Sequence, residues 1–521
     1  MTRRFTGIMI ILLVATGMYA QGQEEKQSIS LSLQDCIAKA LEHNLGIAIE
    51  YLTPQLRDAD IAQANEKFLP TLSLNLLFNK QEQASYSFLD AAEVLTEDFN
   101  QYGLTLNQEI PTGGNLAVQL NSSQYDTNRT GVYINPSYRA QLRFEFTQPL
   151  LRNFGFNNAK RDILIAQTNY GVSEEELKRA LQETVYTVEQ AYWELVFAIE
   201  SLKVEQLSLK LAQDLLEKNE RAVEVGTMAP IEIVSAKAQV ASREASILAA
   251  ETAVRNAEDR LKLVINLAVE IPEADSMTIN PTEQPDFAQK DIDLQEALRA
   301  ALQNRPDLKA QRIGLENYER NVGYAKNQLL PNLDLRASYW SPGVSGDQLI
   351  FDPDDPLGPP IGSIPGGRED AFKDVFGFTY NNWSVGFTFD FPLNTVVSRA
   401  AHVKAKVDLE QALLRLKNQE QQIYTDLKIA VRDVETNFKR INALKVAREL
   451  AEKQLEAEEE KLKVGLTTNF VVLTYQSDLA TARSNEIRAI IDYLLSLALL
   501  NRDMGVNLED RNIRISQFLN Q

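Results

Sequence analysis

The spacing of apolar residues changes abruptly at two Leu-Pro pairs. In residues 327–338, NQLLPNLDLRAS, a helical spacing is replaced after Pro331 by the alternation of Leu333 and Leu335 with polar residues. Residues 66–77, EKFLPTLSLNLL, make the same change at Pro70. Proline lacks a backbone N–H donor and restricts the residue before it, so it favours the end of a helix. The pattern predicts a helix-to-strand junction at each pair.

Alternating segments predict strands with one apolar and one polar face. These segments are residues 72–78, 140–147, 332–336 and 383–391. Charged residues such as Arg143 and Glu145 on the polar face fit a membrane barrel that encloses water, although a soluble sandwich of half-buried strands also alternates. A few strands cannot close a barrel of useful width. We therefore expect several chains to contribute to one barrel.

Two more segments belong to this region. Residues 102–123 contain two alternating runs around Pro-Thr-Gly-Gly, which predicts a β-hairpin. This hairpin either adds two strands to the barrel, which we prefer, or lies outside the membrane. Residues 341–370 are rich in Pro, Gly and Asp, and predict an outward-facing loop. Its aspartates lack the spacing of a Ca²⁺-binding loop, so we predict no metal site there.

Two very long helices are predicted over residues 158–224 and 398–463, after the strand-to-helix prolines Pro149 and Pro392. At 1.5 Å per residue each would be roughly 100 Å long. Within residues 182–203 the apolar positions follow the 3-4 spacing of a coiled-coil seam, and Trp193 and Phe197 widen the apolar surface beyond it. Each long helix runs into a glycine turn and a returning helix. Such helices suit a wall in which every helix has neighbours on both sides.

The sequence contains an internal duplication, in which the second half repeats the pattern of the first. An offset of 261 residues places Leu33 over Leu294 and Pro70 over Pro331 without a gap, and both segments begin with a helix-capping pattern. We therefore predict a signal peptide over residues 1–20, a first repeat over 21–266, a linker over 267–291, a second repeat over 292–503 and a C-terminal tail over 504–521.

The N-terminus has the three parts of an export signal: Arg3 and Arg4, an apolar run from about Ile8 to Tyr19, and then small and polar residues. No later apolar run reaches the roughly 20 residues of a membrane helix, so membrane insertion is expected through strands. The formal net charge of −19 argues against nucleic acid as a partner. A single cysteine, Cys36, leaves no internal disulfide.

This order of elements resembles the TolC family of outer-membrane efflux proteins. The resemblance is carried by the two LPxLxL junctions, by QPLL (148–151) and WSVGFTFDFPL (383–393), and by the turns VGT (225–227) and VGLT (464–467). It implies an α+β fold in which a duplicated helix–strand–helix unit forms, as a trimer, an outer-membrane β-barrel continued by a long periplasmic α-helical barrel.

The resemblance also implies a function. The protein would be the outer-membrane channel of a tripartite efflux or type I secretion system, with a periplasmic adaptor and an inner-membrane pump as partners. The adaptor-docking tips would be Val225, Gly226, Thr227, Val464, Gly465, Leu466 and Thr467. Glu232, just past the first turn, is the candidate for a lumen gate, whereas Val471 and Thr474 past the second turn are not acidic.

The sequence allows two other interpretations. An enzyme is disfavoured because the two histidines, His43 and His402, stand on separate predicted helices and no nucleophile motif, cofactor motif or phosphate loop occurs. A periplasmic coiled-coil adaptor or scaffold would explain the long helices and glycine turns. It would not explain the duplicated Leu-Pro-strand units, so it remains the alternative.

Overall fold

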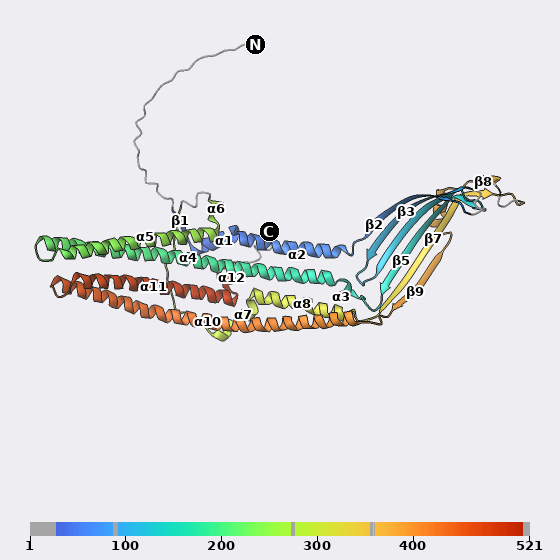
Figure 1. The fold of residues 1–521 in the computed structure, drawn as a ribbon. Coiled ribbons are helices and arrows are strands. Elements are labelled where there is room, and N and C mark those ends of the chain that lie inside the picture. The colour runs from blue at the N-terminus through green and yellow to red at the C-terminus, as the bar shows by residue number, and fades with distance from the viewer. Residues whose placement is uncertain (1–27, 87–91, 272–276, 355–357, 359, 514–521) are drawn as a thin grey trace, which may run out of the picture. The chain divides into compact units, whose positions relative to one another are not determined.

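The computed structural model describes residues 28–86, 92–271, 277–354, 358 and 360–513 (Figure 1). The predicted signal peptide therefore lies outside the described residues. The chain divides into two compact units, each of which draws on both halves of the sequence. Unit 1 lies within residues 1–44, 187–288 and 438–495, and unit 2 within residues 45–186, 289–437 and 496–521.

The duplication is visible in the lengths of the helices. The helices α1 (Leu33–His43) and α7 (Leu294–Asn304) both have 11 residues, and α2 (Leu45–Glu66) and α8 (Pro306–Asn327) both have 22. The long helices α4 (Arg161–Glu224) and α10 (Val396–Lys463) have 64 and 68 residues, and the returning helices α5 (Ile231–Ile265) and α11 (Asn469–Met504) have 35 and 36. The order and lengths of the elements therefore agree with an internal repeat.

The two capping patterns fold differently. Ser32 forms a full capping box with Asp35 at the start of α1. Asp293 caps α7 by accepting a hydrogen bond from the backbone N–H of Gln295, at 3.0 Å, rather than through Glu296. Both predicted caps therefore form, and only the first of them is a full capping box.

Unit 1 is built from helical hairpins and a small sheet. The returning helices α5 and α11 follow α4 and α10, and β1 (Ser28–Leu31) pairs in parallel with β6 (Thr278–Pro281), which lies in the predicted linker together with α6 (Leu267–Glu270). The seam predicted in α4 is buried at Val188, Tyr192 and Leu195, and Trp193 and Val196 are buried as well. The helix thus packs on more than one face, as its broad apolar surface indicates.

Unit 2 contains one large antiparallel sheet with the order β2-β3-β4-β5-β7, in which β7 also pairs with β8 and β9 (Figure 1). The strands are β2 (Thr71–Ala84), β3 (Val94–Glu109), β4 (Asn115–Thr127), β5 (Ile134–Pro149), β7 (Asn332–Ile350), β8 (Gly362–Ile364) and β9 (Asn382–Asp390). The hairpin predicted in residues 102–123 is β3–β4, and it lies inside the sheet between β2 and β5. The preferred interpretation, two additional strands in the same sheet, agrees with this topology.

Short helices complete unit 2. They are α3 (Phe156–Ala159), α9 (Arg368–Phe376) and α12 (Asn507–Asp510), the last of which lies in the predicted C-terminal tail. Within the described part of the chain, no helix is long and apolar enough to cross a membrane.

The loop predicted over residues 341–370 was partly wrong. Strand β7 continues to Ile350, and α9 begins at Arg368 and packs on β5 and β7. Gly343 has a packing role here, because a Cβ at this position would lie 2.0 Å from the carbonyl oxygen of Ala371 in α9. A glycine that reads as a loop signal in the sequence is instead the place where a helix approaches a strand closely.

Candidate functional site

One face of the sheet is apolar on every long strand. The register places Leu74 beside Leu104, Leu104 beside Leu120, and Leu120 beside Leu142. On the other side of β5, Phe144 lies beside Tyr339 and Tyr339 beside Trp383. Many of these side chains are exposed, among them Leu72, Leu74, Leu76, Phe78, Trp383, Val385, Phe387 and Phe389. An exposed apolar surface of this extent indicates contact with lipid or with another protein.

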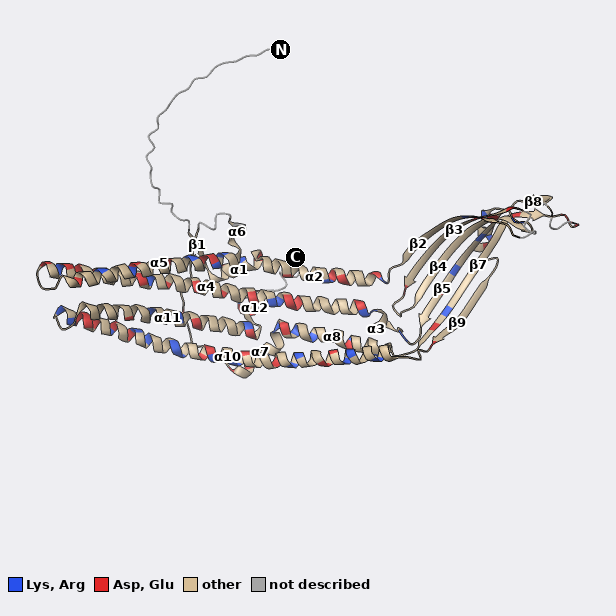
Figure 2. Cartoon of the chain, viewed as in Figure 1, with Lys and Arg blue, Asp and Glu red and all other residues tan. Residues whose placement is uncertain are grey.

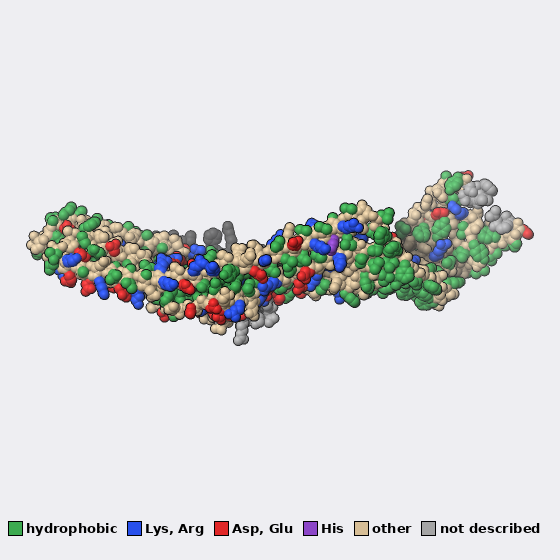
Figure 3. Space-filling model, turned by 90° about the horizontal axis from the view of Figure 1, so that it is seen from below, with side chains coloured by type: hydrophobic (Ala, Val, Ile, Leu, Met, Phe, Trp, Pro, Cys, Tyr) green, Lys and Arg blue, Asp and Glu red, His purple; other side chains and the backbone are tan. Residues whose placement is uncertain are grey.

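The apolar face is a band of limited height. On β2 it runs from Leu72 to Phe78, which at about 3.3 Å per residue is roughly 20 Å along the strand, close to the apolar band of membrane strands. Aromatic residues mark its edge away from the helices, where Phe78 packs edge-to-face on Tyr102 at 5.7 Å. Figure 3 shows hydrophobic side chains gathered on the sheet next to the helices of the same unit.

At the end of the band away from the long helices, α9 covers the same face and packs on Leu120 and Leu142 of the apolar row. Ala371 and Val375 of α9 are buried against Ala140. Arg368, at the start of α9, stacks over Tyr102 at 4.7 Å and Tyr138 at 5.5 Å. The aromatic rings and α9 thus mark the edge of the apolar band, as aromatic residues do at a membrane–water interface.

The opposite face of the sheet is polar. Arg143 lies 3.7 Å from Glu145 and stacks over Trp340 at 5.5 Å on this face. Ser338 and Ser384 form a hydrogen bond across β7 and β9. Figure 2 shows that charged residues are frequent on the helices and sparse on the strands. At the level of the apolar band, the charges on the strands, such as Arg143 and Glu145, therefore lie on the face where a water-filled lumen would accept them.

All four predicted junction prolines lie at ends of strands. Pro70 and Pro331 immediately precede β2 and β7, Pro149 is the last residue of β5, and Pro392 follows β9 by two residues. The ends of α2 and α8 close in the same way, because Leu69 and Leu330 each donate a backbone hydrogen bond to the carbonyl three residues earlier. The sequence pattern places these boundaries to within a residue or two.

The junction before β7 is also held by side chains that the sequence analysis did not single out. The Asn327 amide donates to the carbonyl oxygen of Leu151 at 3.1 Å, and its Oδ1 accepts from the backbone N–H of Asn153 at 2.7 Å. Gln328 accepts from Arg152 at 2.6 Å. The Asn-Gln of NQLLP therefore binds the turn that follows QPLL. No spacing in the sequence indicates this pairing across 174 residues.

In unit 1 the two long hairpins turn at Gly226 and Gly465. Both glycines have left-handed φ values, 77° and 76°. In each turn the glycine N–H and the next N–H bond back to helix carbonyls, Thr227 to Ala222 at 2.9 Å and Leu466 to Lys461 at 2.9 Å. This is the Schellman pattern that ends a helix on glycine.

The residues predicted for adaptor docking stand around these turns. Val225, Val464 and Leu466 are exposed, Leu466 to 77%, although a valine or leucine is usually buried. Ile231 and Phe470 are similarly exposed next to the turns and were missed by the sequence analysis. Ile231 is the first residue of α5 and Phe470 the second residue of α11, and an apolar residue at the start of a returning helix was the signal that could have found them.

Glu232 does not stand alone. Its Oε2 accepts a hydrogen bond from the Asn469 amide at 3.1 Å, and the same amide lies 3.2 Å from the sulfur of Met228. Asn469 is 2% exposed and begins α11, so it joins the tip of one hairpin to the tip of the other. The second repeat thus contributes the amide of Asn469 to this region, whereas the positions past its own turn, Val471 and Thr474, carry no carboxylate. A core of Leu215, Leu455, Val472, Leu473 and Leu479 packs the same hairpins together.

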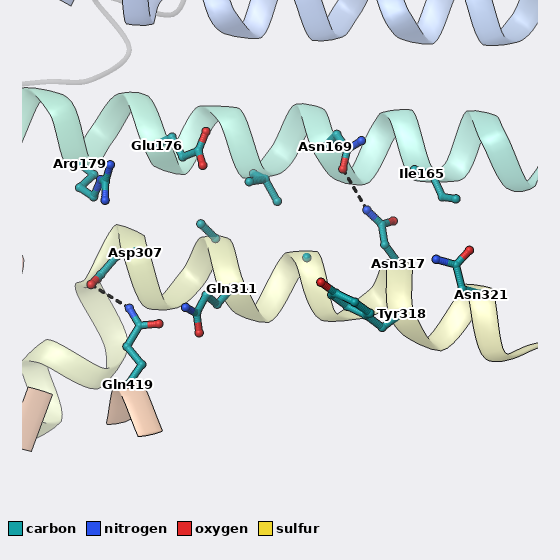
Figure 4. A pocket seen from close by; sticks show the side chains of 13 residues that line it. Ile165, Asn169, Glu176, Arg179, Asp307, Gln311, Asn317, Tyr318, Asn321 and Gln419 are labelled. Atoms are coloured by element: carbon teal, nitrogen blue, oxygen red, sulfur yellow. Dashed lines mark hydrogen bonds between the residues drawn. The ribbon is translucent and has the colours of Figure 1, made fainter. Parts of the chain in front are cut away.

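Unit 2 contains a polar pocket between α4, α8 and α10 (Figure 4). Asn317 donates to Asn169 at 2.9 Å across it, and Gln419 donates to Asp307 at 2.9 Å. Arg305 makes two hydrogen bonds to Asp307, at 3.0 and 2.8 Å. Burial alone would raise the pKa of Asp307, but the hydrogen bonds and charge of Arg305 and the bond from Gln419 outweigh it and hold the pKa below its usual value of 3.8. The cluster ties helices together and offers no nucleophile or metal ligand set.

The fold and these surfaces define a class: a protein with a two-faced antiparallel sheet, apolar and exposed on one face, and long helical hairpins. The sequence matches the profile of the outer membrane efflux proteins over residues 127–267 and 297–506. The chain belongs to this family. It is also 22% identical over 402 residues to outer membrane protein TolC of Vibrio cholerae serotype O1, across 75% of this chain and 82% of that protein.

Solved structures have the same fold. The Campylobacter jejuni CmeC outer membrane channel superposes with a TM-score of 0.62 at 15% identity, covering 98% of this chain and 99% of that one. The outer membrane protein VceC from Vibrio cholerae superposes with a TM-score of 0.61 at 17% identity, covering 91% and 96%. The predicted TolC-like fold and family are therefore confirmed, and the family consists of outer-membrane channels rather than enzymes.

Proposed function

We propose that this protein is the outer-membrane channel of a tripartite efflux or type I secretion system. It assembles as a homotrimer and passively conducts substrates that an inner-membrane pump and a periplasmic adaptor deliver. The apolar face of the sheet contacts outer-membrane lipid, and the helical hairpins extend into the periplasm. The observation that carries the proposal is the exposed apolar cluster Val225, Val464, Leu466 and Phe470 at the two glycine turns.

This cluster supports adaptor docking for a physical reason. Turns between solvated helices are usually polar, and large apolar side chains at such positions lose free energy unless a partner covers them. Gly226 and Gly465 leave space around themselves, since a Cβ at either would meet no atom within 4 Å. A partner's helices can therefore approach the backbone of both turns.

A substitution at the tip tests docking. Leu466→Ser is expected to abolish copurification of the adaptor and to raise drug susceptibility to that of a deletion strain, because it removes the most exposed apolar side chain of the turns. Leu450→Ser is the matched control, since Leu450 is also exposed but lies within α10. Equal adaptor binding by both variants, with trimers intact, would overturn the docking role.

The alternative, a soluble periplasmic adaptor or scaffold, is separated by fractionation. The channel proposal requires recovery of the protein in outer membranes, with release only by detergent. Recovery in the soluble periplasm would reject it, whatever the result of the Leu466 experiment. The face of β2 and β9, with apolar side chains exposed at every second residue, supports the membrane location.

A further inference from the structure

The sheet of unit 2 has two more long strands than the junction prolines account for. Strands β2, β5, β7 and β9 each begin or end beside one of these prolines. The hairpin β3–β4 does not, yet it pairs along nearly its whole length with β2 on one side and β5 on the other. The apolar row passes without interruption through Leu74, Leu104, Leu120 and Leu142. The hairpin is therefore part of the same wall.

Both outer strands of this wall have a free side. Within the described residues β2 pairs only with β3, and β9 pairs only with β7. The outward backbone groups of β2 and β9 thus have no strand partner. A long exposed edge with apolar side chains is a template for pairing with another strand.

The two edges are complementary to each other. Strand β2 begins directly after Pro70 and β9 ends shortly before Pro392, so both have one end at the helices and run in opposite directions. Their apolar side chains lie on the same face, and Leu74 and Phe387 are both 67% exposed. Strand β9 of one copy can therefore pair antiparallel with β2 of a second copy, and the apolar face continues across the contact.

One chain cannot close this wall around a channel. Without the three-residue β8, the sheet has six long strands, β2, β3, β4, β5, β7 and β9. A barrel of eight strands is just wide enough for side chains to fill its interior, so six strands would leave no passage. The number of long strands in each copy is even, so the two edge strands of one copy run in opposite directions. Identical sheets can therefore join edge to edge with every neighbouring pair antiparallel.

We propose that the β3–β4 hairpin widens the channel, and that six strands from each of three copies close a wall of eighteen strands by pairing β9 of one copy with β2 of the next. The inference rests on the proposed trimeric channel and specifies its bore. The four strands next to the prolines alone would make a wall of twelve. Because barrel diameter grows roughly linearly with strand number, the hairpin makes the wall about one and a half times as wide.

Deletion of residues 94–127 tests the strand count. The remaining residues 85–93 and 128–133 can connect β2 to β5, and removal of a whole hairpin keeps Leu74 and Leu142 on the same face. Electron microscopy of the purified full-length protein should show eighteen strands, and that of the deletion variant twelve, both in trimers. Twelve strands in the full-length protein, with the hairpin outside the wall, would overturn the inference.

Cysteine cross-linking tests the edge contact without a deletion. In a Cys36→Ser background, Leu74→Cys is combined in turn with Val385→Cys, Phe387→Cys and Phe389→Cys, and Thr388→Cys on the opposite face is the control. A disulfide requires Cβ atoms about 3.5–4.5 Å apart, so at least one same-face pair should link different copies and the control pair should not. No intermolecular bond from any same-face pair would reject β9–β2 pairing. If twelve strands are seen while the adaptor still copurifies, the channel function stands and only the wider wall fails.

Discussion

At the scale of single residues, the hydrogen bond between Asn469 and Glu232 joins the two hairpin tips of unit 1. The bond is 3.1 Å long, and the Asn469 side chain is almost fully buried. A hydrogen bond to a charged group contributes about 1.5–3 kcal/mol. In the channel that we propose, loss of this contact would let the two tips separate more easily.

Asn469→Ala is expected to loosen this contact and to increase the open probability of single channels in planar bilayers. The matched control is Asn442→Ala, because Asn442 is exposed on α10 and its amide bonds only to Phe438 of the same helix at 3.4 Å. Identical open probabilities in the two variants would mean that Asn469 does not hold the tip closed.

Gly465 is the second residue whose identity matters by itself. An L-residue in the left-handed region costs roughly 1–2 kcal/mol, and Gly465 has a φ of 76°. Gly465→Ala should lower the thermal stability of the purified protein and weaken adaptor copurification. Gly323→Ala within α8 has open space and no left-handed φ, so it should be neutral or raise stability by about 0.5–1 kcal/mol. Equal effects of the two substitutions would contradict the role assigned to the turn.

At the scale of elements, the ion pair of Arg305 and Asp307 links the ends of α7 and α8 to α10 through Gln419. The lowered pKa of Asp307 means that folding favours its ionised form. This contribution is fully present above the unfolded pKa, near 3.8, and is lost as the pH falls through the lower pKa of the folded state. The pair therefore stabilises unit 2 at neutral pH and not in strong acid.

Asp307→Asn should accordingly lower the unfolding temperature at pH 7, and the difference from wild type should shrink as the pH falls below 3.8. Asp259→Asn, at an exposed position of α5, is the control and should leave the temperature unchanged at both pH values. A difference that stays constant from pH 7 to pH 3 would show that the charge of Asp307 is not what stabilises the cluster.

At the scale of the whole molecule, the two faces of the sheet decide where the chain meets lipid. Phe387 and Thr388 are neighbours on β9 and point to opposite faces. Lysine on a lipid-facing position near the bilayer midplane costs about 2–4 kcal/mol, whereas a lumen-facing lysine contacts water.

Phe387→Lys is therefore expected to reduce the amount of assembled protein in outer membranes severalfold, and Thr388→Lys to leave it near the wild-type amount. Heat-resistant trimers in outer-membrane fractions, quantified by immunoblotting, provide the measurement. If Thr388→Lys were the more damaging change, the assignment of the lipid face would be reversed.

The sequence by itself determined the long helices, the strands next to the prolines and their order along the chain. Local chemistry was sufficient, because prolines end helices, glycines close the hairpin turns, and the period of apolar positions separates helix from strand. The predicted bounds of the long helices agree with α4 and α10 to within a few residues. The internal repeat was recognised from equivalent helix–strand junctions such as Pro70 and Pro331.

Only the tertiary structure decided how distant segments combine. The two units each mix both repeats, Asn327 binds the turn at Asn153, and Asn469 meets Glu232, all across long stretches of chain. Residues 341–350 read as loop because their glycines and proline are local loop signals, yet they are strand because α9 and β5 pack against them. Such outcomes depend on contacts between residues far apart in the chain, and a local pattern carries no information about which distant partner will be present.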